Sequence, residues 1–416
     1  MSTIYLAAVI FVLTYVLISL RGLPKLRMNK GAAALIGGAL MVLFGIVAFT
    51  DVPDSINFDV ILLLLGMMIL AAGLEFSGFF DIVSDKLVII SGNRVKLLAS
   101  IMVASAVLSA VILNDAVVLI FTPIVIKCCR RIDCEPVPYL IGVMFSANIG
   151  SLATPIGNPQ NAYIASESGM TFIDFTVHTL PIALLCLPVA FIIIFLMFRK
   201  KLVSPSTTAL EIKSRNVDHF GLGVMLTVCI GAFVGFVFSD LLGVKLYVIA
   251  MTAGMLALIF MISKNTKNII WVAKKVDWGI LAFFIGLFVL MAGIVNSGLL
   301  DQIASLFPGF GDGGSPSILG LTAFSALLSN LVSNVPAVML IGDMIPQGSM
   351  MLWCTLAASS TLAGNATLIG SAANVIVSER SEEMGVKFNF WKFTLVGIPV
   401  TLVTLMISVG ILTLFG

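Results

Sequence analysis

Long apolar runs separated by short polar segments dominate the chain. Ten of these runs are long enough for an α-helix to cross a bilayer at a rise of ~1.5 Å per residue. They lie near residues 3–20, 31–49, 57–75, 137–165, 178–198, 220–238, 244–262, 277–297, 350–378 and 393–415. Two more apolar stretches, 95–127 and 316–346, are too long for one crossing and too short for two crossings with a turn. Each predicts a re-entrant helical hairpin, which must be buried in protein or line a wet cavity.

The composition agrees with a chain whose main solvent is lipid. Hydrophobic residues make up 59% of the 416 residues, charged residues 11%, and the mean hydropathy is +1.14, whereas soluble domains carry about 25% charged residues. The sequence therefore predicts an all-α polytopic membrane protein. A net charge of +2 does not suggest a nucleic-acid partner.

Cysteine and histidine do not form a pattern typical of a metal or redox enzyme. The six cysteines contain no CxxC pair, and the two histidines, His178 and His219, do not lie at metal-ligand spacing. We therefore expect no cofactor beyond a coupling ion, H⁺ or Na⁺.

The basic residues predict how the chain is oriented. If the loop 21–30 is cytoplasmic and neither hairpin crosses the membrane, 22 of the 23 Lys and Arg residues face the cytoplasm, and Lys245 alone lies outside. This distribution satisfies the positive-inside rule. We predict an integral, multi-pass protein of the plasma (inner) membrane, with both termini extracytoplasmic.

The chain contains an internal repeat. The segment LLGMMILAAGLEFSGFFD, which ends at Asp81, matches FIGLFVLMAGIVNSGLLD, which ends at Asp301, and TPIGNPQN from Thr154 matches TLIGSAAN from Thr367. Each half holds five crossings plus one hairpin, so the second half enters the membrane upside down. We predict repeat 1 over 1–198 (hairpin 95–127, broken helix 137–165), a cytoplasmic linker over 199–219, and repeat 2 over 220–416 (hairpin 316–346, broken helix 350–378).

Four polar segments interrupt the apolar sequence at matched places in the two halves: LNDAV at 113–117, TPIGNPQN at 154–161, SNVPA at 333–337 and GNATLIGSAAN at 364–374. Hairpin tips present helix N-termini that hold anionic or polar groups, and the carbonyls of an unwound helix bind cations. We predict one central site, with Asn114 and Asn334 also as candidate sodium ligands. Its substrate- or ion-binding residues are Asn114, Asp115, Thr154, Gly157, Asn158, Pro159, Asn161, Ser333, Asn334, Thr367, Gly370 and Asn374.

The predicted site residues also have purely structural interpretations. Asn, Asp and Ser are ordinary helix caps and Pro an ordinary kink, but four segments paired by a repeat favour a transport site. Ser109, Ser329 and Ser371 are further candidates, although a membrane serine often bonds its own backbone. Asp115 is paired by the repeat with Val335, and a carboxylate at bilayer depth costs roughly 2.5–3.5 kcal/mol. It is either a proton or cation carrier or a protonated cap of the hairpin.

The same segments resemble a known family. NDAVVLIFTPIV (114–125), NIGSLATPIGNPQN (148–161), SNVPAV (333–338) and NATLIGSAANVIVSE (365–379) resemble the arsenite permease and melanosomal P-protein branch of the ion transporter superfamily, which also includes sodium-coupled dicarboxylate and citrate carriers. The resemblance implies two inverted repeats, a homodimer and an elevator-like motion. For an arsenite pump it also implies a soluble ATPase partner.

The hairpin tips bear on the substrate. The dicarboxylate carriers place a Ser-Asn-Thr motif at each tip, whereas this chain has Leu113-Asn114-Asp115 and Ser333-Asn334-Val335. The lost threonines and the added acid argue against a doubly charged carboxylate, and the Asn-Asp and Asn-x-Pro tips resemble the arsenite branch. However, the run from Asn158 to Asn161 resembles the threonine-proline-proline-asparagine element of the carboxylate carriers.

Two carrier functions follow, and two other classes are less consistent with the sequence. The leading hypothesis is gradient-coupled export of arsenite or a related small (oxy)anion, with Asp115 carrying the coupling proton. The alternative is a sodium/proton antiporter or a sodium-coupled di- or tricarboxylate symporter. An intramembrane enzyme is disfavoured because no histidine lies at membrane depth to activate a nucleophile. A channel is less typical of paired hairpins than alternating access.

Overall fold

The computed structural model describes residues 3–19, 30–90, 93–203, 218–305, 317–346 and 348–415. Every regular element in these ranges is a helix, which confirms the all-α class. The elements are α1 (Thr3–Ser19), α2 (Lys30–Leu43), η1 (Phe49–Asp51), α3 (Val52–Ser55), α4 (Phe58–Phe76), α5 (Phe79–Ile90), α6 (Arg94–Val111), α7 (Asn114–Arg131), α8 (Val137–Ser151), α9 (Pro159–Ser168), α10 (Phe172–Leu202), α11 (His219–Val237), α12 (Leu246–Lys264), α13 (Asn268–Lys275), α14 (Trp278–Asn296), α15 (Leu299–Ser305), α16 (Ile318–Val332), α17 (Asn334–Gly342), α18 (Met350–Ala363), α19 (Ala372–Glu383) and α20 (Phe390–Phe415).

Seven helices in the described ranges are long and apolar enough to cross a membrane, namely α4, α6, α10, α11, α12, α14 and α20. The apolar helices α1 and α2 are shorter. Both predicted broken helices are interrupted, with α8 ending at Ser151 before α9 begins at Pro159, and α18 ending at Ala363 before α19 begins at Ala372. The short helices η1, α3, α5, α13 and α15 were not predicted, because they lie between the apolar runs.

The repeat is visible in the helix boundaries. Helices α4 and α14 have 19 residues each, and each is followed by a glycine with a left-handed backbone, Gly78 (φ 78°) and Gly298 (φ 75°). Glycine adopts this conformation without steric cost, so both helices turn at the same place. Most of the predicted linker (204–217) lies outside the described residues, as do the basic residues Arg21, Lys25, Arg27, Lys213 and Arg215.

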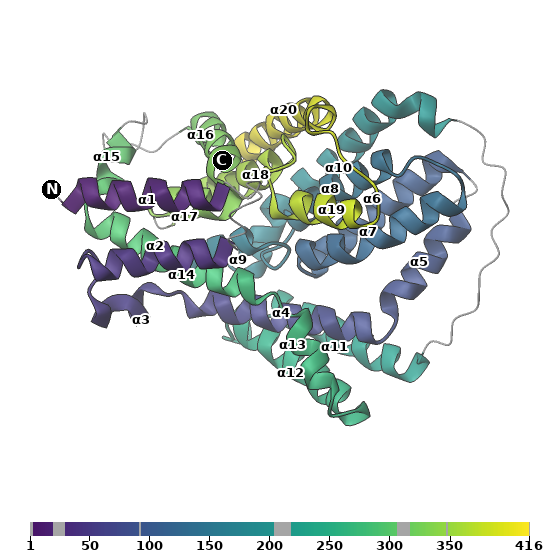
Figure 1. Cartoon of the computed structure of the whole chain (residues 1–416), viewed down its shortest axis with the longest axis horizontal. Coiled ribbons are helices and arrows are strands. Elements are labelled where there is room, and N and C mark those ends of the chain that lie inside the picture. The colour runs from purple at the N-terminus through teal and green to yellow at the C-terminus, as the bar shows by residue number, and fades with distance from the viewer. Residues whose placement is uncertain are drawn as a thin grey trace.

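One unit of the structure, which we call the frame, comprises α1–α4 and α11–α14. Two helix pairs within the frame each join one repeat to the other. Helix α2 packs along α14, and α12 along α4 (Figure 1). The contacts are so close that a Cβ atom on Gly286 would lie 2.3 Å from the Ala34 carbonyl carbon, and one on Gly66 2.4 Å from that of Ala250. Small residues allow this backbone contact, which compensates for the weak hydrophobic drive between helices in lipid.

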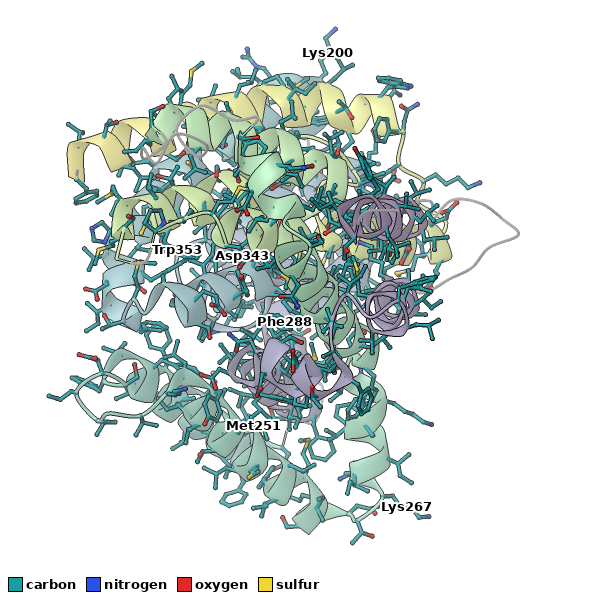
Figure 2. All side chains as sticks on the ribbon, turned by 90° about the vertical axis from the view of Figure 1, so that its left-hand side faces the viewer. Lys200, Met251, Lys267, Phe288, Asp343 and Trp353 are labelled. Atoms are coloured by element: carbon teal, nitrogen blue, oxygen red, sulfur yellow. The ribbon has the colours of Figure 1, made fainter. Side chains whose placement is uncertain are left out.

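The remaining long helices form a second unit, the bundle, which comprises α6–α10 and α16–α20. Within it α6 packs on α8, α16 on α18, α7 on α19 and α10 on α20. Seen from the left-hand side of Figure 1, Trp353 and Asp343 of the bundle region lie above Phe288 of α14, with Met251 of the frame below (Figure 2). The Phe288 ring lies 6.1 Å from that of Tyr163 in α9, so frame and bundle are in direct contact.

A polar link also joins the two units. Asn57, which caps the N-terminus of α4, donates from its side-chain nitrogen to Glu167 Oε1 at 2.6 Å and to Ser166 Oγ at 2.9 Å, both in α9. These bonds tie one end of the frame to the end of a broken helix.

Candidate functional site

Each hairpin in the bundle has a tip that is bonded to the broken helix of its own repeat. At the first tip, between α6 and α7, the backbone N–H of Asn114 donates to the Gly157 carbonyl at 2.9 Å. At the second tip, between α16 and α17, the side-chain nitrogen of Asn334 donates to the Gly370 carbonyl at 3.0 Å and to that of Ser360 at 3.2 Å. Gly157 and Gly370 are equivalent positions of the repeat, so both tips are attached at the same place, the first through a backbone donor and the second through a side-chain donor.

The second tip has an unusual backbone. Ser333 adopts φ 80° and ψ 156°, a region that residues other than glycine rarely populate, whereas Leu113 at the first tip has φ −54°. Such a conformation costs roughly 1–3 kcal/mol and is found mainly at functional sites. The two tips are therefore not equivalent in conformation.

The unwound segment of the first broken helix is held by one asparagine. Asn161 donates from Nδ2 to the Ser151 carbonyl at 3.0 Å and to the Thr154 carbonyl at 3.1 Å. Its backbone N–H donates to the side chain of Asn158, the N-cap of α9, at 2.8 Å. These bonds supply partners to carbonyls that the broken helix leaves without one.

The second broken helix repeats this arrangement. Asn374 donates from Nδ2 to the Gly364 carbonyl at 2.8 Å and to the Thr367 carbonyl at 3.1 Å, and its N–H donates to the N-cap Ser371 Oγ at 3.2 Å. Asn374 is fully buried, as is Asn161. The repeated pattern shows that these two asparagines hold the backbone open.

Each broken helix is also bonded to the opposite repeat. Asn148 of α8 donates from Nδ2 to Asn365 Oδ1 at 2.8 Å and to Ser371 Oγ at 3.1 Å. At the equivalent position of α18, Thr361 Oγ1 accepts from Gln160 Nε2 at 3.3 Å. The two unwound segments therefore form one hydrogen-bonded unit.

The threonines that begin the two unwound segments bond to the first arm of their own hairpin. Thr154 Oγ1 donates to the Ala110 carbonyl at 2.6 Å, and Thr367 Oγ1 donates to Asn330 Oδ1 at 3.2 Å. Ala110 and Asn330 are equivalent positions of the repeat. Hairpin and broken helix are thus joined at the tip and along the arm.

A cavity of about 110 Å³ lies where these elements meet. The N-termini of four helices, α7, α9, α17 and α19, all contribute to its wall. Helix N-termini carry free N–H groups and the positive end of the helix dipole. The lining residues are Asn114, Asp115, Asn148, Pro159, Gln160, Ser333, Asn334, Val335, Ser371, Ala372, Ala373 and Ile376 from the bundle, and Lys30, Asp277, Gly279, Ile280, Phe283 and Phe284 from the frame region.

A second cavity, of about 90 Å³, adjoins the first and shares Asp115 with it. Glu75 and Lys275 also line this second cavity and form an ion pair. Asp115 lies in the first turn of α7, where the helix dipole favours a negative charge. The Asp115 carboxylate therefore lies between the central cavity and the second cavity, which is lined by the Glu75–Lys275 ion pair.

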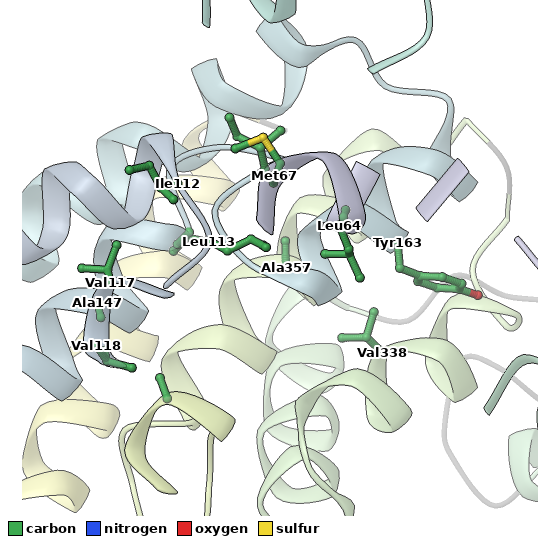
Figure 3. Close-up of a cluster of buried hydrophobic side chains, with 14 of the residues drawn as sticks. Leu64, Met67, Ile112, Leu113, Val117, Val118, Ala147, Tyr163, Val338 and Ala357 are labelled. Carbon is green, nitrogen blue, oxygen red and sulfur yellow. The ribbon is translucent and has the colours of Figure 1, made fainter. Parts of the chain in front are cut away.

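An apolar cluster backs the first hairpin tip. Ile112 and Leu113, both buried, lie in the same cluster as Leu64 and Met67 of α4 (Figure 3). Ile112 and Leu113 thus anchor the tip in the core, while Asn114 and Asp115 line the central cavity and Leu113 also reaches the second one.

The predicted site residues fall into three groups. Those that line the central cavity are Asn114, Asp115, Pro159, Ser333, Asn334 and Ser371. Those that do not line it but form or hold the unwound segments are Thr154, Gly157, Asn158, Asn161, Thr367, Gly370 and Asn374. Ser109 and Ser329 are buried one turn before the tips, and neither hydroxyl has a hydrogen-bond partner among the described residues. In the described ranges, no group of three His, Cys, Asp or Glu side chains is arranged to hold a metal.

Sequence reasoning missed several residues of the site. Asn148 corresponds to Thr361 in the repeat, and Asn330 corresponds to Ala110. Because the paired residues differ in type, only the numerical shift between the two halves could have identified them. Lys30 and Asp277 lie at the starts of apolar helices and carry no local signal. They reach the cavity through tertiary packing.

Two hairpins and two broken helices around one polar cavity, in a chain with several membrane-length helices, define a membrane transporter. The citrate transporter (CitMHS) family model matches residues 13–350, and the chain belongs to this family. The predicted membership of the ion transporter superfamily is thereby confirmed.

Relatives match over nearly the whole chain. A 46 kDa membrane protein of Mycobacterium leprae is 30% identical over 97% of this chain and 96% of its own length. The silicon efflux transporter of Oryza sativa is 27% identical over 98% of this chain and 97% of its own length. Among solved structures, the YdaH transporter of Alcanivorax borkumensis matches 99% of this chain and 97% of its own with a TM-score of 0.57 at 14% identity, a likeness of fold.

Proposed function

We propose that this transporter exports a small, weakly acidic oxyacid, such as arsenite, and that the proton gradient drives the export. One observation carries the proposal: four helix N-termini and one hairpin carboxylate, Asp115, surround a single cavity. The N–H groups suit oxygen atoms that accept hydrogen bonds, while the carboxylate suits a hydroxyl group or a proton. An oxyacid that is mostly uncharged at neutral pH offers both.

The polar side chains of the cavity support the same ligand class. Asn114 is 5% exposed, lines the cavity, and its Oδ1 has no hydrogen-bond partner among the described residues. A buried acceptor of this kind is costly unless something bonds to it, so it suits a substrate hydroxyl. Gln160 and Ser371 also line the cavity, and their side chains carry donor groups.

Size and charge favour a small solute over a tricarboxylate. The volume of about 110 Å³ corresponds to roughly three to four times the share that one water takes in the liquid. The acids around the two cavities are Asp115, Asp277 and Glu75, against the bases Lys30 and Lys275. An ion with three negative charges would meet an excess of carboxylates, which disfavours its binding.

The structure supports a proton more than sodium as the coupling ion. The carbonyls of Ser151, Thr154 and Gly157, expected at a cation site, each accept a hydrogen bond from within the protein. A sodium ion would have to share or displace these donors. Asp115, by contrast, already faces both cavities.

The proposal includes the movement that transport needs. The frame, with its interlocked glycines, stays fixed, and the bundle moves as one unit because its hairpins and broken helices are bonded together. In this proposal the hairpins are re-entrant, the termini are extracytoplasmic and the motion is elevator-like. The silicon efflux transporter supports an outward direction for a hydroxylated metalloid acid.

The test is transport in proteoliposomes with arsenite, silicic acid, citrate and sodium supplied separately under imposed pH or sodium gradients. We expect pH-driven accumulation of arsenite or silicic acid in the wild type. Asp115→Asn keeps the shape of the side chain, so it should keep the fold and downhill exchange while losing accumulation against a gradient.

Two outcomes would overturn the assignment. If Asp115→Asn accumulates solute with unchanged dependence on pH, Asp115 does not carry the proton. If only citrate is transported, and only under a sodium gradient, both the substrate class and the coupling ion are wrong. Asp54→Asn, which changes an exposed acid in α3, is the matched control and should behave like the wild type.

A further inference from the structure

The first hairpin ends in a turn that brings two cysteines together. Helix α7 stops at Arg131, Asp133 adopts a left-handed backbone with φ 48°, and the N–H of Cys134 donates to the Cys129 carbonyl at 3.0 Å. This six-to-one bond around a left-handed residue is the Schellman motif. In this motif the residue that follows the left-handed one contacts the residue five positions before it in the helix. Here these two residues are Cys134 and Cys129.

The surroundings of the pair favour a thiolate. The pKa of Cys134 is lowered chiefly by the neighbouring Cys129 thiol as a hydrogen-bond donor, and further by the Tyr139 hydroxyl and the Arg94 guanidinium, which together outweigh its partial burial and the nearby Asp133 carboxylate. Tyr139 is only 1% exposed, and its hydroxyl makes no other hydrogen bond among the described residues. Arg94 donates to the Asp133 carbonyl at 3.1 Å, which holds the turn beside this charge.

The two cysteines differ in access. Cys134 is half-buried in the loop, whereas Cys129 is fully buried in the last turn of α7, and both are free thiols. An accessible, activated thiol beside a buried second thiol is the arrangement of redox-responsive cysteine pairs. Arg130 and Arg131 lie in the last turn of α7, directly before the loop, and the positive-inside rule predicts that this end of the hairpin faces the cytoplasm.

We propose that Cys134 and Cys129 form a reversible thiol–disulfide site at the base of the first hairpin, with a hydroperoxide as the oxidant. The Cys134 thiolate attacks one peroxide oxygen, the O–O bond breaks, and protonation of the leaving oxygen releases one water from hydrogen peroxide. The Cys129 thiol then loses its proton and attacks the Cys134 sulfenic acid, which releases a second water. The two thiols lose two electrons in total, and the peroxide gains them.

The disulfide would restrain the hairpin that carries Asn114 and Asp115. It closes a covalent link between the end of α7 and the loop that leads into α8, so the base of the hairpin loses freedom. We expect oxidation to slow transport several-fold. This consequence rests on the proposed transport function, whereas the chemistry of the pair does not.

The experiment treats the purified full-length protein with hydrogen peroxide and maps its cysteines by mass spectrometry without reduction. We expect a Cys129–Cys134 disulfide that dithiothreitol reverses. Cys134→Ser and Cys129→Ser should each abolish it, while Cys128→Ser, the adjacent buried control, should leave it intact. In Cys129→Ser, Cys134 should instead stop at the sulfenic acid, which dimedone captures.

A second measurement tests the activation of Cys134 without relying on disulfide formation. Iodoacetamide should label Cys134 faster than an ordinary exposed thiol at pH 7, and its rate should rise less steeply between pH 7 and 9, because more of it is already thiolate. Tyr139→Phe removes a donor, so it should slow the labelling at pH 7 several-fold while leaving the rate at pH 9 nearly unchanged.

The results separate this proposal from the proposed function. A missing disulfide together with ordinary labelling kinetics would overturn the redox site even if transport proceeds as proposed. A reversible disulfide that forms in a protein unable to transport any of the tested solutes would leave the redox site standing and refute the transport assignment instead.

Discussion

The sharpest test of the fold is the removal of one asparagine side chain from a broken helix. Asn374→Ala deletes the amide that donates to the Gly364 and Thr367 carbonyls at 2.8 and 3.1 Å. The substitution leaves two carbonyls without these donors and also a space in a fully buried region. It does not touch the frame or the hairpin tips.

The magnitude follows from what each lost bond costs. A buried polar group left without its partner costs about 1–3 kcal/mol, whereas side-chain hydrogen bonds in membrane proteins average about 0.6 kcal/mol. The substitution also removes the Oδ1 atom that accepts from Asn148 Nδ2 at 3.3 Å. Three lost bonds therefore bracket the loss between about 2 and 9 kcal/mol, and we expect about 2–4 kcal/mol. For a chain of this size that lowers the melting temperature by several degrees.

The assay uses the protein's own cysteines. Cys186 and Cys354 are buried in the bundle, so a maleimide dye that fluoresces on reaction reports their exposure during heating in detergent. Asn389→Ala is the matched control: it removes a single exposed amide that accepts from the Lys392 N–H at 3.1 Å. It should change the melting temperature by about 1 °C or less.

The reasoning would be refuted if Asn374→Ala melted at the same temperature as Asn389→Ala. Asn161→Ala in the first repeat should also melt below the control, because it loses the equivalent pair of bonds to the Ser151 and Thr154 carbonyls. The double variant should lose less than the sum of the two, since Asn148 and Thr361 join the unwound segments into one network and coupled sites are not additive.

Three further outcomes are expected. Gly286→Ala should lower stability by about 1–3 kcal/mol in thermal melts, because its Cβ would lie 2.3 Å from a facing backbone atom. The control Gly231→Ala, whose Cβ would have nothing within 4 Å, should be neutral or slightly stabilising. Equal losses in the two variants would contradict the close packing of α2 on α14. Asn57→Ala should speed amide hydrogen exchange near Glu167 in α9 because two bonds between frame and bundle are lost, and unchanged exchange would show that the link is unimportant. Lys245→Met should leave the melting temperature nearly unchanged, since its ion pair with Asp59 of α4 is exposed; a clear loss in the same melts would contradict this.

The sequence predicted the helices and the central polar segments because their signals are local. Apolar length identified the long helices, and the two breaks lie where Gly157, Pro159 and Gly370 interrupt regular helix. Asn114 and Asn334 line one cavity because the hairpin tips stand at equivalent places in the two repeats.

Other features depended on contacts between distant residues. Lys30 and Asp277 reach the cavity only because α2 and α14 pack across the repeats. The roles of Asn148 and Thr361 follow from which face of α8 meets α18. The Cys129–Cys134 pair required the left-handed turn at Asp133, which is uncommon for an aspartate and leaves no clear mark in the sequence.

The packing of α2 on α14 and of α12 on α4 has a consequence for how the protein is made. The positions of Gly38 and Gly286 differ by 248 in the sequence, so the glycine face of α2 leaves the ribosome long before its partner helix is synthesised. The first half of the nascent chain must therefore wait in the membrane with two unmatched helix surfaces, shielded by lipid or by the insertion machinery. Maturation is completed late, and a chain truncated before α12 would retain both exposed surfaces and become a target for membrane quality control.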